Sequence, residues 1–233
     1  MARPVKTFKE ILAFLASGMA AGAAIGVGGW SYATLRILEP YGAFYGSLAF
    51  SLGIILVCVF GLMLYTGKIG YLFRDWLFSS DNKPSTLRER AIGLLMIYVG
   101  NVIGALSVGL LAGWLSPQAT AQSLASIAVT KSGANIIELF VKSILCGMLV
   151  YTGVDLYKTY KGVLGTFLVA ICIAAFVLLG FDHCVANAFY WGAGLSGGAD
   201  ANWTFPFTGV LLCAVGNSVG ALALDGGKAL FGK

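Results

Sequence analysis

The only histidine of the chain lies beside an acidic residue, inside a long apolar stretch from about residue 163 to 191. Its surroundings read Gly-Phe-Asp-His-Cys-Val-Ala-Asn, which brings Asp182, His183 and Asn187 close together in sequence. An imidazole and a carboxylate are costly to bury at bilayer depth, so by default such groups line a cavity and mark a functional site. Imidazole, with a reference pKa of about 6.5, is suited to donating a proton or a hydrogen bond. The sequence therefore places its candidate chemistry at His183.

The elements that position this histidine belong to a membrane protein. Hydrophobic residues make up 58% of the chain and charged residues only 11%, whereas about a quarter of a soluble domain is charged. The net charge of +5 collects in the loops, which indicates membrane topology and not a nucleic-acid partner. We expect residues 1–233 to form one all-α membrane domain in a lipid bilayer.

Six apolar segments are long enough to cross a bilayer. The second and fifth exceed a simple span, and each contains a polar interruption that begins at a glycine, Gly61 or Gly180. We therefore predict six transmembrane helices, of which the second and fifth are broken. The segments are about Ile11–Leu35, Ala43–Phe73, Ala91–Leu115, Ile136–Tyr157, Val163–Trp191 and Phe205–Leu230.

Basic residues in alternate loops orient these segments. The other loops contain only Arg36, Lys131 and, in the last of them, no basic residue at all. By the positive-inside rule, both termini are expected in the cytoplasm, with the first segment an uncleaved helix of the inner membrane. The basic residues on that side are Arg3, Lys6, Lys9, Arg74, Lys83, Arg88, Arg90, Lys158, Lys161, Lys228 and Lys233.

An internal repeat relates the two halves of the chain. Val-Gly-Asn-Val-Ile-Gly-Ala-Leu at 99–106 returns as Val-Gly-Asn-Ser-Val-Gly-Ala-Leu at 215–222, with six identities in eight. Segments three spans apart cross in opposite directions, which predicts an inverted repeat of about 1–116 and 131–233. The interruption at 61–66 then corresponds to 180–185. We expect Asn101 and Asn217 to satisfy backbone groups that the breaks set free.

Structural roles compete with functional ones at several polar residues. His183 would be a core histidine if it bonded a free carbonyl, and Asp182 would be structural if it bound backbone amides of the break. Thr66 would either line the pathway or cap a helix. Glu138 and Lys142, one turn apart, are expected to form an ion pair within one helix.

The five cysteines predict neither a metal site nor a disulfide framework. They all lie in apolar segments, without a CxxC pair, and small buried core residues are the better interpretation. No cofactor motif is present in the sequence. Apart from Asp182 and Cys184, no second catalytic group accompanies His183, so an enzyme using this histidine as a base is disfavoured.

The sequence resembles the formate/nitrite transporter family, which are pentameric channels of aquaporin-like fold for small monovalent anions. The resemblance covers all six segments. It rests on GFDHCVANAF at 180–189, FSLGIIL at 50–56, LYT at 64–66 and the paired VGNxxGAL segments. It implies a homopentamer of channels for formate, nitrite, hydrosulfide or a similar weak-acid anion, linked to protons through a central histidine.

The resemblance also implies roles for individual residues. His183 would be the central pore histidine, facing Thr66, and Lys131 would attract anions into the outer vestibule. The cytoplasmic constriction would consist of Phe50, Ile54 and Phe176, and the periplasmic one of Leu64, Tyr65 and Val150. The chain departs from the family pattern at Asp182, Gly147 and Tyr65, where glutamate, asparagine and phenylalanine are common. Gly147 would remove a polar group from the pore lining.

The physical chemistry of the residues agrees with a pathway for weak acids. Apolar constrictions impede a bare ion because desolvating a charge is costly, and a donor at the centre lowers that cost. The substrate would enter as an anion and cross as a neutral acid or as an anion paired with a proton. The alternative is a channel for neutral small solutes of the aquaporin type, against which the absence of an Asn-Pro-Ala tripeptide argues.

Overall fold

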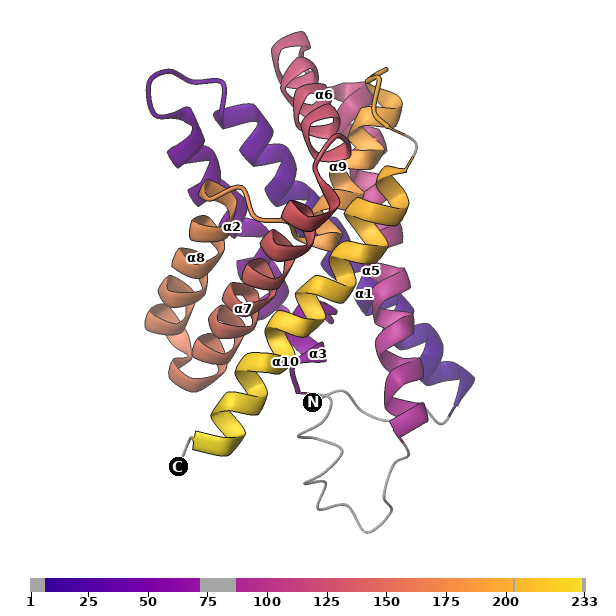
Figure 1. The fold of residues 1–233 in the computed structure, drawn as a ribbon, viewed down its shortest axis with the longest axis vertical. Coiled ribbons are helices and arrows are strands. Elements are labelled where there is room, and N and C mark those ends of the chain that lie inside the picture. The colour runs from indigo at the N-terminus through magenta and orange to yellow at the C-terminus, as the bar shows by residue number, and fades with distance from the viewer. Residues whose placement is uncertain (1–6, 72–86, 203, 232–233) are drawn as a thin grey trace.

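Every regular element in the described part of the chain is a helix (Figure 1). The computed structural model describes residues 7–71, 87–202 and 204–231. The helices are α1 Phe8–Leu35, α2 Gly42–Val59, α3 Thr66–Ile69, α5 Leu87–Leu115, α6 Gln118–Ser132, α7 Ile136–Tyr160, α8 Gly162–Leu178, α9 Cys184–Ser196, the π-helix η1 Pro206–Leu212 and α10 Cys213–Phe231.

The prediction of an all-helical membrane protein is confirmed. Within the described residues, α1, α2, α5, α7 and the continuous stretch Pro206–Leu230 are each long and apolar enough to span a bilayer. The apolar helix α8 is shorter, at 17 residues. The chain is therefore a multi-pass membrane protein.

Local sequence explains where several helices begin. Thr7 caps α1 through a capping box, in which its hydroxyl accepts from the Glu10 amide and the Glu10 carboxylate accepts from the Thr7 amide. Asn135 caps α7 by accepting from the amides of Ile137 and Glu138. Pro117 stands directly before α6, where its missing N–H costs no helical hydrogen bond.

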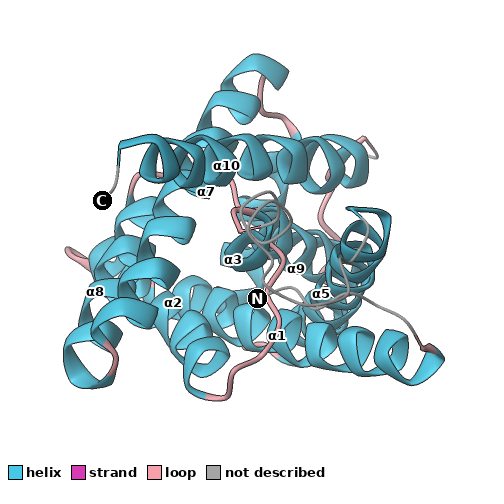
Figure 2. Cartoon of the chain, turned by 90° about the horizontal axis from the view of Figure 1, so that it is seen from below, coloured by secondary structure: helices cyan, strands magenta, loops and turns pink. Residues whose placement is uncertain are grey.

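Both predicted helix breaks are present. The first separates α2 from α3, and the second separates α8 from α9. Gly61 and Gly180 turn the chain at φ of 65° and 69°, a left-handed conformation that glycine adopts without a steric penalty. Viewed along the helices, α3 and α9 lie in the middle of a ring formed by the longer helices (Figure 2). The breaks therefore bring backbone and polar side chains to the centre of the molecule.

Each half contains one close helix crossing, α1 against α5 in the first half and α7 against α10 in the second. A Cβ at Gly22 would stand 2.0 Å from the carbonyl oxygen of Asn101, and one at Gly147 would stand 2.1 Å from that of Asn217. Neither position has room for a side chain, so the backbones touch directly. Each half thus packs a glycine against the asparagine of its own VGN segment.

The segment between α5 and α7 corrects an expectation from the sequence. Residues 118–132 were expected to be a loop, but they form α6, which packs on α9. Lys131 lies in the last turn of this helix. Because α6 is a regular helix that packs on α9, it can hold Lys131 beside the break between α8 and α9.

Other helix bounds also differ from the sequence prediction. The third segment begins at Leu87 and not at Ala91, so the expected loop residue Arg90 is buried in α5, with 4% of its surface exposed. The sixth segment opens with the π-helix η1. Of the predicted features, Phe73 and the basic residues Arg3, Lys6, Arg74, Lys83 and Lys233 lie outside the described residues.

One end of the molecule gathers several chain segments. The first turn of α1, the turn between α7 and α8, and the last turn of α10 all lie at the lower end in Figure 1. The connection between α1 and α2 and the helix α6 lie at the opposite end. Lys158 and Lys161 belong to the first group, which agrees with the charge pattern used to orient the chain.

Candidate functional site

His183 is the cap of α9 and faces the other break. Its Nδ1 accepts a hydrogen bond of 3.3 Å from the Ala186 amide, and its Nε2 lies 2.9 Å from the Thr66 hydroxyl at the start of α3. Only 2% of its surface is exposed. Since Nδ1 accepts from a backbone N–H, the ring proton belongs on Nε2, which donates to Thr66. The breaks thus meet through a neutral imidazole and a hydroxyl.

The position of the ring favours this neutral form. A proton on Nδ1 would remove the hydrogen bond from Ala186 and place a positive charge at the N-terminus of α9, where the helix dipole is also positive. His183 is therefore arranged as a donor of one hydrogen bond toward the centre of the molecule.

Two asparagines hold the breaks with matching sets of hydrogen bonds. Asn101 donates to the carbonyls of Gly18 and Met63 and accepts from the Tyr65 amide. Asn217 likewise donates to the carbonyls of Ser143 and Asp182 and accepts from the Cys184 amide. The two sets are equivalent residue by residue when 61–66 is aligned with 180–185. In this alignment Leu64 occupies the position of His183.

Aromatic rings border His183 on one side. Phe50 of α2 packs edge to face on Phe176 of α8, with ring centroids 5.7 Å apart. Phe176 in turn stacks on the His183 ring at 5.8 Å. These rings line a cavity together with Lys131 and Asn187. Ile54, one turn after Phe50, is buried with 1% of its surface exposed.

A second cavity lies on the other side of the breaks. It is lined by Leu64 together with Val57, Cys58, Gly61, Leu62, Gly67, Lys68, Val154, Tyr157 and Lys158. Val150, one turn before Val154 on α7, is buried. Two separate cavities therefore flank the region where the breaks meet.

The residues that line these cavities contradict the expected positions of the two constrictions. Phe50 and Phe176 were expected at the opposite end of the pathway from Lys131, but the three residues line one cavity. Leu64 shares its cavity with Lys158, near the turn between α7 and α8. The two sets of constriction residues thus exchange ends, because α2 enters from the α6 end and reaches its break only after Phe50 and Ile54.

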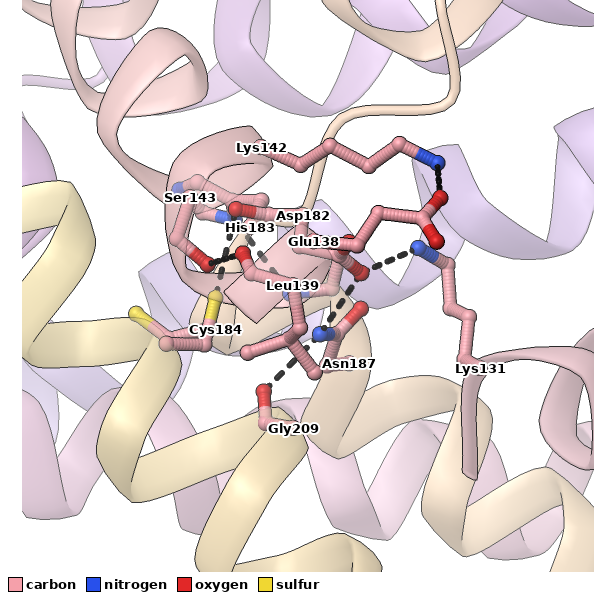
Figure 3. Close-up of polar contacts among 12 residues, drawn as sticks. Lys131, Glu138, Leu139, Lys142, Ser143, Asp182, His183, Cys184, Asn187 and Gly209 are labelled. Carbon is pink, nitrogen blue, oxygen red and sulfur yellow. Dashed lines mark hydrogen bonds and ion pairs between the residues drawn. The ribbon is translucent and has the colours of Figure 1, made fainter. Parts of the chain in front are cut away.

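Lys131, Asp182 and Asn187 form a buried polar cluster (Figure 3). Lys131 Nζ lies 2.6 Å from Asp182 Oδ1, which also accepts from Asn187 Nδ2 at 3.2 Å. The side chain of Lys131 is 19% exposed and that of Asp182 only 5%. The carboxylate binds side chains here, and not the backbone amides that were considered as its alternative partners. Lys131 therefore carries a paired charge, held at the wall of the cavity.

Tyr65 and Gly147 lie differently from what the pore roles implied. The Tyr65 hydroxyl pairs with Ser218 at 2.8 Å, and its ring packs on Tyr98 with centroids 4.9 Å apart. Gly147 faces the backbone of Asn217 in α10, in the position that Gly22 holds in the first half. The inference that Gly147 removes a polar group from the pore lining is wrong for this chain, because its missing Cβ makes room for the helix crossing.

Comparison with known proteins decides the family. The family model described as Formate/nitrite transporter matches residues 4–230. The chain belongs to the formate/nitrite transporter family.

Relatives of this family member include channels and transporters with assigned substrates. The chain is 30% identical over 195 residues to the formate channel FocA of Haemophilus influenzae, a match of 78% of this chain and 66% of FocA. It is 28% identical over 184 residues to the nitrite transporter NirC of Salmonella typhimurium, a match of 76% of this chain and 66% of NirC. The chain thus spans slightly less than two thirds of the length of these relatives.

Solved structures show the same fold. A structure described as an FNT family ion channel superposes with a TM-score of 0.84 at 24% identity, over 95% of this chain and 90% of that one. A pentameric formate channel with formate bound superposes with a TM-score of 0.78 at 22% identity, over 97% and 98% of the two chains.

Some polar contacts of this site could not be inferred from the sequence. Asn187 also donates to the Gly209 carbonyl in η1, and π-helices give no recognisable pattern in a single sequence. The helix α6 did leave a signal, since Leu124, Ile127, Ala128 and Lys131 recur at helical spacing between Pro117 and Gly133.

Proposed function

We propose that this chain is a channel for small monovalent weak-acid anions, such as formate, nitrite or hydrosulfide, and that its transport is linked to protons at His183. The observation that carries the proposal is the buried Nε2–H of His183, which meets Thr66 between two cavities. The assigned substrates of FocA and NirC agree with this class of solute.

The apolar parts of the site oppose the passage of a bare anion, and the polar parts favour it. Removing an anion from water is costly, and the rings of Phe50 and Phe176 and the side chain of Leu64 provide no hydrogen bond. His183 and Thr66 supply donors at the narrow centre. The Lys131 ammonium lies on the wall of the cavity that Phe50 and Phe176 line. A positive charge there attracts anions and raises the acidity of nearby water.

Proton linkage follows from the state of the imidazole. His183 holds a single ring proton and would become an imidazolate if it surrendered that proton to the substrate. We propose that the proton travels on the substrate and that the Nε2–H donates to an acceptor oxygen or sulfur of the substrate as it passes. Transport is then linked to pH through the fraction of substrate that is protonated.

Assembly and orientation complete the proposal. We propose a homopentamer with one pathway in each protomer, by analogy with the neighbour described as a pentameric formate channel. We also propose that the chain lies in the inner membrane with both termini in the cytoplasm, because the lysines of the α7–α8 turn share an end with α1 and α10. The cavity of Lys131 then opens to the outside.

Uptake by liposomes that contain only this protein tests the function. Formate, nitrite, hydrosulfide and lactate would each be supplied at several pH values, while an internal dye reports proton movement. We expect at least one of these anions to enter with protons, faster than into empty liposomes. Water or glycerol permeation without anion uptake would instead establish a neutral-solute channel and overturn the proposal.

A further inference from the structure

Asn187 presents a buried oxygen that has no hydrogen-bond partner among the described residues. The side chain is completely buried, in the second turn of α9. Its Nδ2 donates to Asp182 Oδ1 at 3.2 Å and to the Gly209 carbonyl at 2.8 Å. Its Oδ1 bonds to nothing in the described part of the chain. An acceptor left unsatisfied in a buried place is unfavourable, so this oxygen calls for a donor from outside the chain.

The orientation of the amide is fixed by its two partners. Both Asp182 Oδ1 and the Gly209 carbonyl are acceptors, so a flipped amide would set oxygen against oxygen twice. Figure 3 shows the Asn187 oxygen pointing away from Gly209, on the side where Lys131 lies. Asn187, Lys131 and His183 line the same cavity. The unpaired oxygen therefore belongs to the wall of the proposed pathway.

The chemistry of the wall identifies what fits there. Lys131 and His183 offer N–H donors, which suit an anion. Formate and nitrite anions have no acidic hydrogen to give to Asn187 and are repelled by its oxygen, whereas an undissociated acid carries both an acceptor and an acidic hydrogen. We infer that Asn187 Oδ1 binds the acidic O–H or S–H hydrogen of the substrate in its undissociated form. This inference rests on the proposed function.

The matched variants Asn187→Val and Asn187→Thr test the inference with formate as the probe. The two side chains have nearly the same shape, but only threonine retains an oxygen that can accept a hydrogen bond while donating to Asp182. Formate uptake into liposomes would be driven in two ways. An inward pH gradient drives the undissociated acid, and a membrane potential at equal pH drives the anion.

We expect Asn187→Val to slow the pH-driven uptake by roughly threefold to tenfold, the factor that one net hydrogen bond is worth. Its potential-driven uptake should slow less, and Asn187→Thr should keep the wild-type ratio of the two rates. An equal loss in both modes would show a structural role only, and no loss in either would show a site for water only; either result overturns the inference.

Two controls keep the test decisive. Thermal stability and native mass are measured for both variants, and if the valine variant does not assemble, Asn187→Ala and Asn187→Ser make the same comparison. Failure of the wild-type protein to take up formate, nitrite or hydrosulfide would instead refute the proposed function. A wild-type protein that transports normally, with two unaffected variants, would refute only the role of Asn187.

Discussion

The two ring nitrogens of His183 do different work. Nδ1 accepts a hydrogen bond from the Ala186 amide and so caps the N-terminus of α9, while Nε2 reaches across to Thr66 in the other break. One side chain thus serves the fold with one atom and the pathway with another. A substitution that keeps the first contact and removes the second separates these roles.

His183→Asn is that substitution. Asparagine is among the strongest helix N-caps, so its oxygen can take over the Ala186 amide, but its amide is too short to replace Nε2. We expect a folded protein that loses its preference for formate over nitrate, a strong-acid anion, because no N–H donor then reaches the position of Nε2. Uptake of both anions at several pH values measures this effect.

An unchanged preference for formate in a folded His183→Asn protein would contradict that role. The histidine would then be a structural cap, and Asp182 and Lys131 would be the next candidates for proton handling.

Lys131 neutralises Asp182, and in the proposed function it also attracts anions. Its removal leaves a buried carboxylate without its cation, which in a fully buried pair costs roughly 3–5 kcal/mol. Lys131→Ala should lose somewhat less, because the lysine is partly exposed. We expect lower thermal stability and slower anion uptake. The double variant Lys131→Ala with Asp182→Asn should regain stability but not uptake.

The pair of Lys142 and Glu138 on α7 provides the control for that experiment. The side chains of Lys142 and Glu138 are 35% and 55% exposed, and such surface pairs contribute about 0–1 kcal/mol. Lys142→Ala should therefore leave the thermal unfolding temperature almost unchanged.

If the double variant of Lys131→Ala with Asp182→Asn recovered uptake together with stability, the attraction assigned to Lys131 would be excluded.

At the scale of elements, the crossing of α7 and α10 depends on an absent side chain. A Cβ on Gly147 would stand 2.1 Å from the Asn217 carbonyl oxygen, and the helices must separate to admit it. Overpacking of this kind costs about 1–3 kcal/mol. The contact here is with backbone atoms, which cannot move aside as easily as a side chain. Gly147→Ala should therefore lower the thermal unfolding temperature in detergent.

Gly226→Ala is the matched change, because a Cβ at Gly226 meets nothing within 4 Å. It also lies on a helix, where alanine is preferred to glycine by roughly 1 kcal/mol. We expect this variant to be at least as stable as the wild type. Equal unfolding temperatures for the two alanine variants would show that the crossing tolerates a methyl group.

The breaks were predictable from the sequence because their causes are local. A glycine at a turn of positive φ, a polar residue in an apolar span and a repeated VGN segment each leave a mark in the sequence. The helix α6 was not predicted because its apolar face is too short for a membrane span. Its residues were therefore assigned to a loop. The π-helix η1 depends on tertiary packing and left no such mark.

Distances between segments could not be predicted in the same way. The ion pair of Lys131 with Asp182 joins residues 51 positions apart, and it depends on how α6 docks against α9. The ends of the pathway at which Phe50 and Leu64 lie were misplaced for a related reason. A family resemblance implies which residues meet, but the direction of each helix decides at which end.

At the scale of the whole molecule, the helices expose many large apolar side chains, among them Phe44, Leu52 and Val163. Lipid covers such residues in a single protomer, and neighbouring protomers cover part of them in an oligomer. The proposed homopentamer predicts a native mass in mild detergent about five times the 24.4 kDa of one chain. A monodisperse monomer or dimer of transport-competent protein would contradict it.

The asparagine clamps have a consequence for how such a protein can change. Six of the seven hydrogen bonds of Asn101 and Asn217 join main-chain groups, and the seventh comes from the Cys213 thiol. None of them involves the side chains at positions 64 and 183. The scaffold is thereby indifferent to which of the two equivalent breaks of the inverted repeat carries the imidazole. New solute preferences can arise by exchanging residues at the centre, while the framework around them is inherited intact.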